Sequence, residues 1–306
     1  MNVAVKKISV PSSDGIHNLE GVVYLPDGEI KGIYHIVHGM TEHIGRYQRI
    51  MTDLAERGYV AVGYDNLGHG YTARDKSELG YIGDKKGWDL LSRDVALFAT
   101  AVKDEYGSEL PYYLMGHSMG SFIVRLTAEK YFTPCKLIIM GTGGPNPAAR
   151  AGLAVIAIIK LIYGGRHISR LIDKLAFGGY NKKFTDTTQK GSWLTTDLEV
   201  RKKYWADDFC TFKFTVSAMG DLIKLMKYSN RSAWFKNISS DLPMLLLSGD
   251  EDPVGDYGKG IVFVTEKLKR NGKDAECILY KGARHEILND FTYENVLNDI
   301  TDFIKK

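Results

Sequence analysis

The sequence predicts an α/β fold with a mostly parallel central sheet. Short apolar runs that suit buried strands, at 32–37, 59–64 and 110–115, alternate with longer segments in which apolar residues recur at helical spacing. The alternation of strand and helix is typical of a parallel sheet covered by helices on both faces. At 306 residues the chain is long enough for one such domain with an insertion.

Composition limits the classes of partner and site. Apolar residues make up 44% and charged residues 25%, which is ordinary for a soluble globular protein. A net charge of +3 does not indicate a nucleic-acid partner. Cys135, Cys210 and Cys277 are widely spaced, so neither a disulfide framework nor a zinc site is predicted. Without a secretory signal or a long apolar run, a cytoplasmic location is expected.

The first half of the chain supplies most of the predicted sheet. Residues 4–25 alternate apolar and polar side chains around a Ser-Ser-Asp-Gly turn, which predicts an antiparallel hairpin at a sheet edge. The strand at 32–37 is followed by a helix that stops at Gly58, and the strand at 59–64 runs into a Gly-rich loop. A long amphipathic helix over 87–106, the strand at 110–115 and its helix, and a strand at 136–140 complete this half.

The pattern changes after residue 142. Residues 143–240 show helical periodicity and little strand character, so we expect an all-helical cap inserted over the strand ends. The sheet resumes at 242–247 and continues with a helix, a strand at 276–280 and a final helix. The predicted domains are therefore a core of residues 1–142 and 241–306 and a cap of residues 143–240.

A G-x-S-x-G motif lies between the strand at 110–115 and the helix that follows it. In this motif Ser118 is flanked by Gly116 and Gly120. A serine at the tip of a tight strand-to-helix turn needs small neighbours, because the two elements crowd the turn. The free N–H groups of the helix can stabilise an oxyanion that develops at the serine. We therefore expect Ser118 to be a catalytic nucleophile.

A serine hydroxyl needs a base, and the base is usually oriented by a carboxylate. His167 lies in the predicted cap, whereas His285 follows the last predicted strand and is the expected base. Asp250, Glu251 and Asp252 follow the strand at 242–247, and their spacing alone does not choose the acid.

An oxyanion hole needs two backbone N–H groups. Met119, directly after the serine, is expected to supply one, and Met40 in the His38-Gly39-Met40 loop is expected to supply the other. His38, His43 and His69 are interpreted as histidines that pack the loops, because no carboxylate has recognisable ligand spacing around them. Neither a metal nor another cofactor is expected.

Five segments of the chain form a recognisable set: H-G-x-x-E-H-x-x-R-Y at 38–47, D-x-x-G-H-G at 65–70, G-x-S-x-G at 116–120, G-x-x-D at 249–252 and W-L-T-T-D in the predicted cap at 193–197. Together they resemble the α/β-hydrolases of the monoglyceride lipase and bacterial lysophospholipase group. The resemblance implies an α/β-hydrolase fold with a cap, and its G-x-x-D pattern selects Asp252 as the acid of a triad with Ser118 and His285. It also implies hydrolysis of carboxylic esters through an acyl-enzyme, with monoacylglycerols or lysophospholipids as substrates.

The predicted cap contains a segment, 151–163, that is apolar on nearly every face apart from Lys160. Thirteen residues are too few to span a bilayer. One interpretation is a helix buried against the core. The other is a wall for an acyl chain, with Ile158 and Ile159 against the substrate, that also rests on a membrane or micelle surface.

Other functions remain open at this point. A narrower pocket would suit an esterase for short or aromatic acyl groups. An aminopeptidase of the same fold would need cap carboxylates to hold an α-amine, and Asp197, Glu199, Asp207 and Asp208 are available. A non-catalytic sensor of small molecules is a further class, but the complete Ser118–Asp252–His285 set argues against it.

Overall fold

The computed structural model describes residues 3–186 and 191–306, in which eight strands form one sheet. The strand order is β1-β2-β4-β3-β5-β6-β7-β8, with β1, β2 and β4 paired antiparallel and the remaining pairs parallel. The mostly parallel sheet is confirmed. The strands are β1 (Ala4–Pro11), β2 (Asn18–Leu25), β3 (Gly32–Val37), β4 (Tyr59–Tyr64), β5 (Tyr112–His117), β6 (Lys136–Met140), β7 (Met244–Gly249) and β8 (Ala275–Tyr280).

The predicted hairpin forms the edge of this sheet. β1 and β2 pair in a register that places Val10 opposite Leu19, and the turn between them contains Gly15 at φ +72°. Only glycine adopts such a backbone conformation without strain, which explains the turn signal in the sequence. The inner strands β3, β4, β5 and β7 are buried along their whole length, as parallel strands covered on both faces must be.

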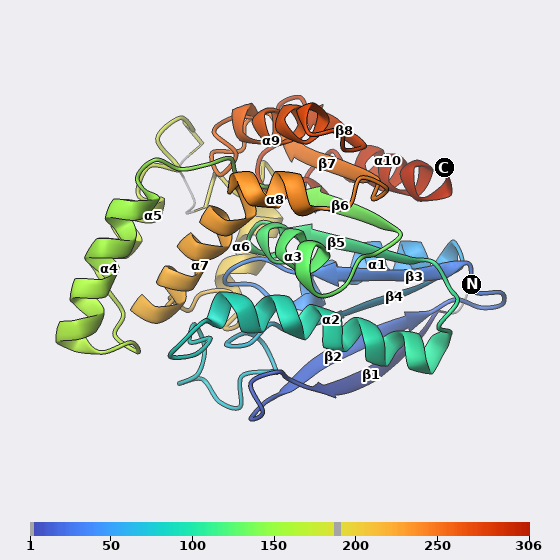
Figure 1. Cartoon of the computed structure of the whole chain (residues 1–306), viewed down its shortest axis with the longest axis horizontal. Coiled ribbons are helices and arrows are strands. Elements are labelled where there is room, and N and C mark those ends of the chain that lie inside the picture. Colours follow the sequence, from blue (N-terminus) through green and yellow to red (C-terminus); the bar gives the residue numbers. More distant parts are fainter. Residues whose placement is uncertain (1–2, 187–190) are drawn as a thin grey trace.

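Helices cover both faces of the sheet, as the alternation of elements predicts (Figure 1). One buried cluster joins the sheet to α1 and α10, and a second joins the opposite face to α2, α3, α8 and α9. Each helix turns an apolar stripe to the sheet and leaves its other side to solvent. The bounds of these helices are α1 (Gln48–Glu56), α2 (Gly87–Tyr106), α3 (Met119–Lys130), α8 (Ser232–Asn237), α9 (Lys259–Arg270) and α10 (Tyr293–Lys305), with 3₁₀ turns η1 (Ile44–Tyr47) and η2 (Ile287–Asn289).

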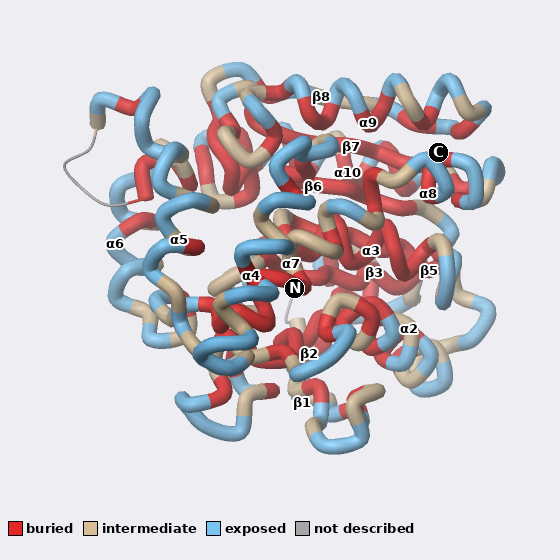
Figure 2. The backbone as a smooth tube through the Cα atoms, turned by 60° about the vertical axis from the view of Figure 1, so that its left-hand side comes forward, coloured by how far each residue is buried: buried red, intermediate tan, exposed pale blue. Residues whose placement is uncertain are grey.

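The segment between β6 and β7 is helical in its described part. Its helices are α4 (Ala149–Tyr163), α5 (Arg170–Phe177), α6 (Leu198–Ala206), α7 (Val216–Ser229) and α8. α4 and α5 stand away from the sheet beyond α7, and much of their surface is exposed (Figures 1 and 2).

α7 and α8 instead pack against α3. In α8 the buried indole of Trp234 donates to the carbonyl of Arg125 at 2.7 Å. The later part of residues 143–240 therefore lies against a helix that covers the sheet. The domain boundaries stay a prediction.

The parallel strands bring their carboxyl ends to one edge of the sheet. The loops after β3, β5, β7 and β8 carry Met40, Ser118, Asp252 and His285 respectively. This is the edge at which α/β sheets usually bind ligands. Among the described helices, none combines the length and apolar character that crossing a membrane requires.

Candidate active site

Ser118 lies at a sharp turn between β5 and α3. Its backbone has φ +54° and ψ −119°, a conformation that non-glycine residues rarely adopt. A Cβ on Gly116 would lie 2.3 Å from the carbonyl oxygen of Gly120, and one on Gly120 would lie 2.1 Å from that of Val37. Both glycines are therefore required by the close approach of strand and helix, and local strain of this kind is common at functional sites.

The side chains of Asp252 and His285 meet behind this turn. Asp252 Oδ2 lies 2.9 Å from His285 Nδ1, and Oδ1 accepts the backbone N–H of Val254 at 2.8 Å. Asp252 is fully buried. Because a carboxylate only accepts, Nδ1 is the protonated nitrogen, which leaves Nε2 as the acceptor.

The two neighbouring carboxylates take other roles. Asp250 Oδ1 accepts the backbone N–H of Gly282 at 2.7 Å, which ties the loop after β7 to the loop after β8. Glu251 lies near the guanidinium of Arg284, with 3.7 Å between Oε2 and Nε. Of the three carboxylates that spacing left open, Asp252 is the one bonded to His285.

Ser118 and His285 line one cavity of about 1210 Å³, together with Met40 and Met119. A Cβ on Gly39 would lie 3.0 Å from the Cβ of Ser118, so the loop after β3 passes directly beside the serine. Met119 begins α3, where backbone N–H groups have no partner within the helix. Among the described residues no hydrogen bond joins Ser118 to His285, and such bonds are often long before a substrate binds.

The cavity wall is largely apolar, but it does not use the residues of α4 that the sequence suggested. Ile158 and Ile159 do not line it. Ile158 is 59% exposed, and Ile159 packs against the buried core. Consecutive residues of a helix differ by about 100°, so Ile158 lies on the side of α4 opposite Ile156. The apolar side chains that do line the cavity include Phe122, Val155, Ile156, Ile172, Leu175, Phe177, Phe212, Met219, Leu222, Ile223 and Phe263.

Comparison with known proteins identifies the family. The Hydrolase_4 family, described as serine aminopeptidase, S33, matches residues 28–292. The chain belongs to this family of α/β-hydrolases.

The relatives of this α/β-hydrolase include proteins named as monoglyceride lipases. A monoglyceride lipase homolog of Monkeypox virus is 32% identical over 280 residues, covering 90% of this chain and 89% of that protein. Human monoglyceride lipase is 32% identical over 264 residues, covering 85% of this chain and 77% of that protein. A carboxyl esterase from Bacillus coagulans, solved in complex with glycerol, superposes with a TM-score of 0.92 at 28% identity and 99% coverage of both chains. The chain is thus a member of the monoglyceride lipase-like group.

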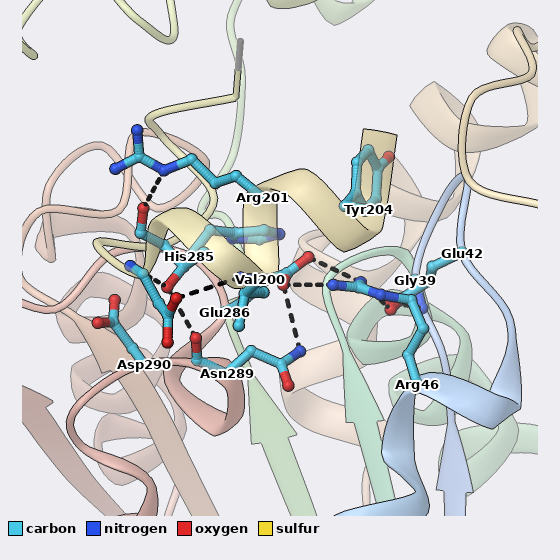
Figure 3. Close-up of polar contacts among 12 residues, drawn as sticks. Gly39, Glu42, Arg46, Val200, Arg201, Tyr204, His285, Glu286, Asn289 and Asp290 are labelled. Atoms are coloured by element: carbon cyan, nitrogen blue, oxygen red, sulfur yellow. Dashed lines mark hydrogen bonds and ion pairs between the residues drawn. The ribbon is translucent and has the colours of Figure 1, made fainter. Parts of the chain in front are cut away.

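A buried ionic cluster, Glu42–Arg46–Glu286, lies next to His285 in this α/β-hydrolase (Figure 3). Arg46 Nη1 donates to Glu42 Oε2 and to Glu286 Oε1, each at 2.8 Å, and Nη2 donates to Glu286 Oε2 at 2.6 Å. Sequence reasoning missed this cluster. Glu42 and Arg46 were visible as part of the segment at 38–47, but nothing in the sequence showed that Glu286 would meet them.

The charges of the cluster stabilise one another. Burial raises the pKa of Glu42, but the hydrogen bond of His117 and the charge of Arg46 outweigh burial and hold it well below its usual value. Burial acts in the same direction on Glu286, whose pKa the charge and hydrogen bonds of Arg46 bring below its usual value. Both carboxylates are therefore ionised at neutral pH.

The other histidines of the site hold loops together. His38 Nε2 accepts the backbone N–H of Asn66 at 2.9 Å, and His69 Nε2 accepts that of Thr41 at 3.3 Å. Burial lowers the pKa of His69 to about 3 and also lowers that of His38, so both rings are neutral.

One group of residues has the composition of a metal site. The ligand atoms of His43, Asp207 and Cys210 lie within 4.8 Å of one another. His43 Nε2 is bonded to Asp207 at 2.9 Å, and burial raises the pKa of the Cys210 thiol. A protonated thiol is a poor metal ligand, so this group is a hydrogen-bonded histidine and aspartate beside a buried thiol.

The cap motif at 193–197 supports the loop that carries His285. The carbonyl of Trp193 accepts the backbone N–H of His285 at 3.3 Å, and that of Leu194 accepts the N–H of Glu286 at 2.7 Å. Thr195 Oγ1 donates to the carbonyl of Asn289 at 2.7 Å. These bonds fix the backbone on both sides of the His285 ring.

Proposed function

We propose that this carboxylic ester hydrolase acts through an acyl-enzyme formed on Ser118. His285 Nε2 takes the proton of the serine hydroxyl while Oγ bonds to the carbonyl carbon of the ester. The tetrahedral adduct then collapses, the ester C–O bond breaks, and His285 gives its proton to the departing alcohol. Water, activated by the same histidine, adds to the acyl group and releases the fatty acid and free Ser118.

Two groups assist these steps. Asp252 keeps the proton of His285 on Nδ1 and stabilises the imidazolium that forms. The backbone N–H groups of Met40 and Met119 are the proposed donors to the oxyanion, because both residues line the cavity beside Ser118. The observation that carries the proposal is the buried bond between Asp252 and His285 at the wall of the cavity that Ser118 shares.

The proposed substrates are monoacylglycerols or lysophospholipids. An apolar cavity of about 1210 Å³ exceeds the usual ~300–1,000 Å³ of small-molecule pockets and suits a long acyl chain. The named activities of the viral and human relatives support the same substrate class. An esterase limited to short or aromatic acyl groups would not need apolar walls of this extent.

The aminopeptidase alternative finds little support in the four carboxylates that the sequence suggested, and Asp173, which does line the cavity, is paired with Lys213 at 2.5 Å. Asp197 caps α6, and Glu199 pairs with Lys202 at 2.5 Å. Asp207 pairs with His43 and Asp208 pairs with Lys76. None of these four carboxylates lines the cavity, where an α-amine would have to be held.

The cap surface supports contact with a lipid surface, which we include in the proposal. Leu161 is 87% exposed and Leu175 is 70% exposed, on neighbouring helices that stand away from the sheet. Arg166, Arg170 and Lys174 are exposed in the same stretch. Apolar side chains rimmed by cations are typical of segments that bind anionic membranes.

A fluorophosphonate, which reacts with activated serines, tests the mechanism. The wild-type protein should be labelled at Ser118, and Ser118→Ala should lose both labelling and hydrolysis of monoacylglycerols by at least ~10³-fold while remaining folded. A non-catalytic sensor would leave the wild type unlabelled. Hydrolysis by Ser118→Ala above about a tenth of the wild-type rate would refute the proposed nucleophile.

A further inference from the structure

The ionic cluster Glu42–Arg46–Glu286 joins two loops, the one after β3 and the one after β8, whose relative position the proposed reaction depends on. Glu42 Oε1 accepts the backbone N–H of Gly39 at 2.6 Å, directly before the proposed oxyanion donor Met40. Glu286 follows the proposed base, His285, in the chain. Arg46 bonds both carboxylates and so spans the gap between the oxyanion loop and the base loop (Figure 3).

His117, which directly precedes Ser118, contacts both loops through its two ring nitrogens. Its Nε2 lies 3.2 Å from the carbonyl oxygen of His285, which can only accept, so this nitrogen carries a proton. Its Nδ1 lies 2.9 Å from the hydroxyl of Tyr47, and that hydroxyl donates to Glu42. With the tyrosine proton committed to Glu42, Nδ1 is also a donor, and His117 is an imidazolium.

The four side chains therefore balance in charge. Two carboxylates alternate with the guanidinium of Arg46 and the ring of His117, all nearly buried. The charge and hydrogen bond of Glu42 outweigh burial and raise the pKa of His117, in agreement with its two acceptors. A buried ion pair that is fully hydrogen-bonded is weak evidence for stability, but it can specify one geometry.

We propose that Arg46 is a positioning residue that sets the distance between the oxyanion loop and the base loop across Ser118. This inference rests on the proposed function. Arg46 touches neither reacting atom in the proposal and acts through Glu42 on Gly39 and through Glu286 on His285. The planar guanidinium bonds two carboxylates at once, which the ammonium of a lysine does with much poorer geometry.

α6 covers the same residue from the cap side. The guanidinium of Arg46 lies 5.0 Å from the ring centre of Tyr204, and the Tyr204 hydroxyl donates to the carbonyl of Thr41 at 3.0 Å. Tyr204 thereby excludes solvent from Arg46 and contacts the oxyanion loop directly. The side chain of Arg46 is only 10% exposed, so water competes little for its hydrogen bonds.

The test compares Arg46→Gln and Arg46→Lys with a matched control, Arg49→Gln. Arg49 lies in the next turn of chain and also pairs with a glutamate, Glu294, but both side chains are more than 60% exposed. Three quantities are measured on a soluble ester: kcat, KM and the affinity for a trifluoromethyl ketone of the same acyl chain. Such a ketone forms a tetrahedral adduct with the serine and therefore reports on the oxyanion hole.

We expect Arg46→Gln to lower kcat by about 30-fold or more, with KM within about threefold of wild type, and to weaken inhibitor affinity by a similar factor. Arg46→Lys should fall between wild type and Arg46→Gln, and Arg49→Gln should stay within about twofold of wild type. If Arg46→Gln does not fold, Arg46→Lys carries the comparison, since it keeps the buried charge.

The inference is overturned if Arg46→Lys and any folded Arg46→Gln keep kcat within about twofold, or if kcat falls while inhibitor affinity is unchanged. Ser118→Ala measured in the same series separates this inference from the proposed function. An inactive Ser118→Ala beside fully active Arg46 variants overturns the positioning role alone. An active Ser118→Ala overturns the mechanism on which that role rests.

Discussion

Ile156 and Ile158 lie on opposite sides of α4: Ile156 lines the cavity that holds Ser118, and Ile158 is 59% exposed on the outer surface. The two positions are two residues apart on one helix and carry the same side chain. They therefore allow the cavity and the exposed surface of α4 to be changed separately.

The first prediction uses this pair to test the acyl-chain wall. We expect kcat/KM for soluble p-nitrophenyl esters to rise with chain length from two to eight carbons, because each buried methylene contributes up to ~0.8 kcal/mol. Ile156→Asp should reduce the increase of kcat/KM between the acetate and octanoate esters at least ~10-fold, since a buried carboxylate draws water into the cavity. Its kcat/KM for the acetate ester should stay within about threefold of wild type. Ile158→Asp is the control and should keep the wild-type rise. A preference for acetyl esters in the wild-type enzyme would contradict the acyl-wall interpretation.

The second prediction concerns the two aspartates of the loop after β7. Asp252→Asn should lower kcat by ~10³–10⁴-fold, because an amide at this place no longer holds the His285 proton on Nδ1. Asp250→Asn keeps an oxygen that accepts from Gly282, so its kcat should fall by less than about tenfold. The measurement is the steady-state kcat of each variant relative to wild type. Equal decreases of less than about tenfold in both variants would rule out Asp252 as the orienting acid.

The third prediction concerns lipid surfaces. Leu161→Asp should weaken sedimentation with vesicles that contain anionic phosphatidylglycerol by about 10-fold or more, because it places a negative charge in the exposed apolar face of α4. Ile16→Asp changes a residue that is 66% exposed in the turn of the β1–β2 hairpin, outside α4 and α5, and should bind as the wild type does. Equal binding by both variants would show that the cap is not the contact surface.

The fourth prediction concerns pH and stability. Asp94 in α2 accepts hydrogen bonds from Ser12 Oγ and from the backbone N–H of Ser13, and burial raises its pKa to about 6. An aspartate in the unfolded chain titrates near 3.9, so between about pH 4 and pH 6 the folded state binds more protons than the unfolded state. As the pH rises from about 4 to about 6, the free energy of unfolding should therefore decrease by up to ~3 kcal/mol because of this group.

Asp94→Asn isolates the effect, because the amide resembles the protonated carboxyl. Urea unfolding at several pH values between 4 and 7 should show a smaller decrease for the variant than for the wild type. Identical pH dependence in both proteins would mean that Asp94 titrates at its ordinary pKa in the folded state.

The sequence predicted the sheet and most helices because their periods are unambiguous. The helix over 87–106 carries a clear apolar stripe and begins and ends where the pattern predicts. The choice among Asp250, Glu251 and Asp252 could not be made by spacing, since all three follow the same strand and the loop backbone decides which carboxylate turns inward.

Two other features were beyond sequence reasoning. α4 is apolar on nearly every face, so its pattern gives no preferred side, and the structure places Ile158 and Ile159 outside the set of residues that line the cavity. Glu286 reads as a loop carboxylate in the sequence. Its partner Arg46 is 240 residues away, and only the folded chain brings the two together.

The backbone N–H groups of His285 and Glu286 donate to the carbonyls of Trp193 and Leu194, so different parts of the inserted segment should tolerate substitution to different degrees. Substitutions, insertions or deletions within α4, α5 and the loop between them would alter what the enzyme accepts without touching the backbone that supports His285. The stretch from Trp193 to Thr195 should not tolerate such changes, because its carbonyls and the Thr195 hydroxyl are hydrogen-bonded directly to the loop that carries His285. Directed evolution toward new esters is therefore best confined to α4, α5 and the loop between them.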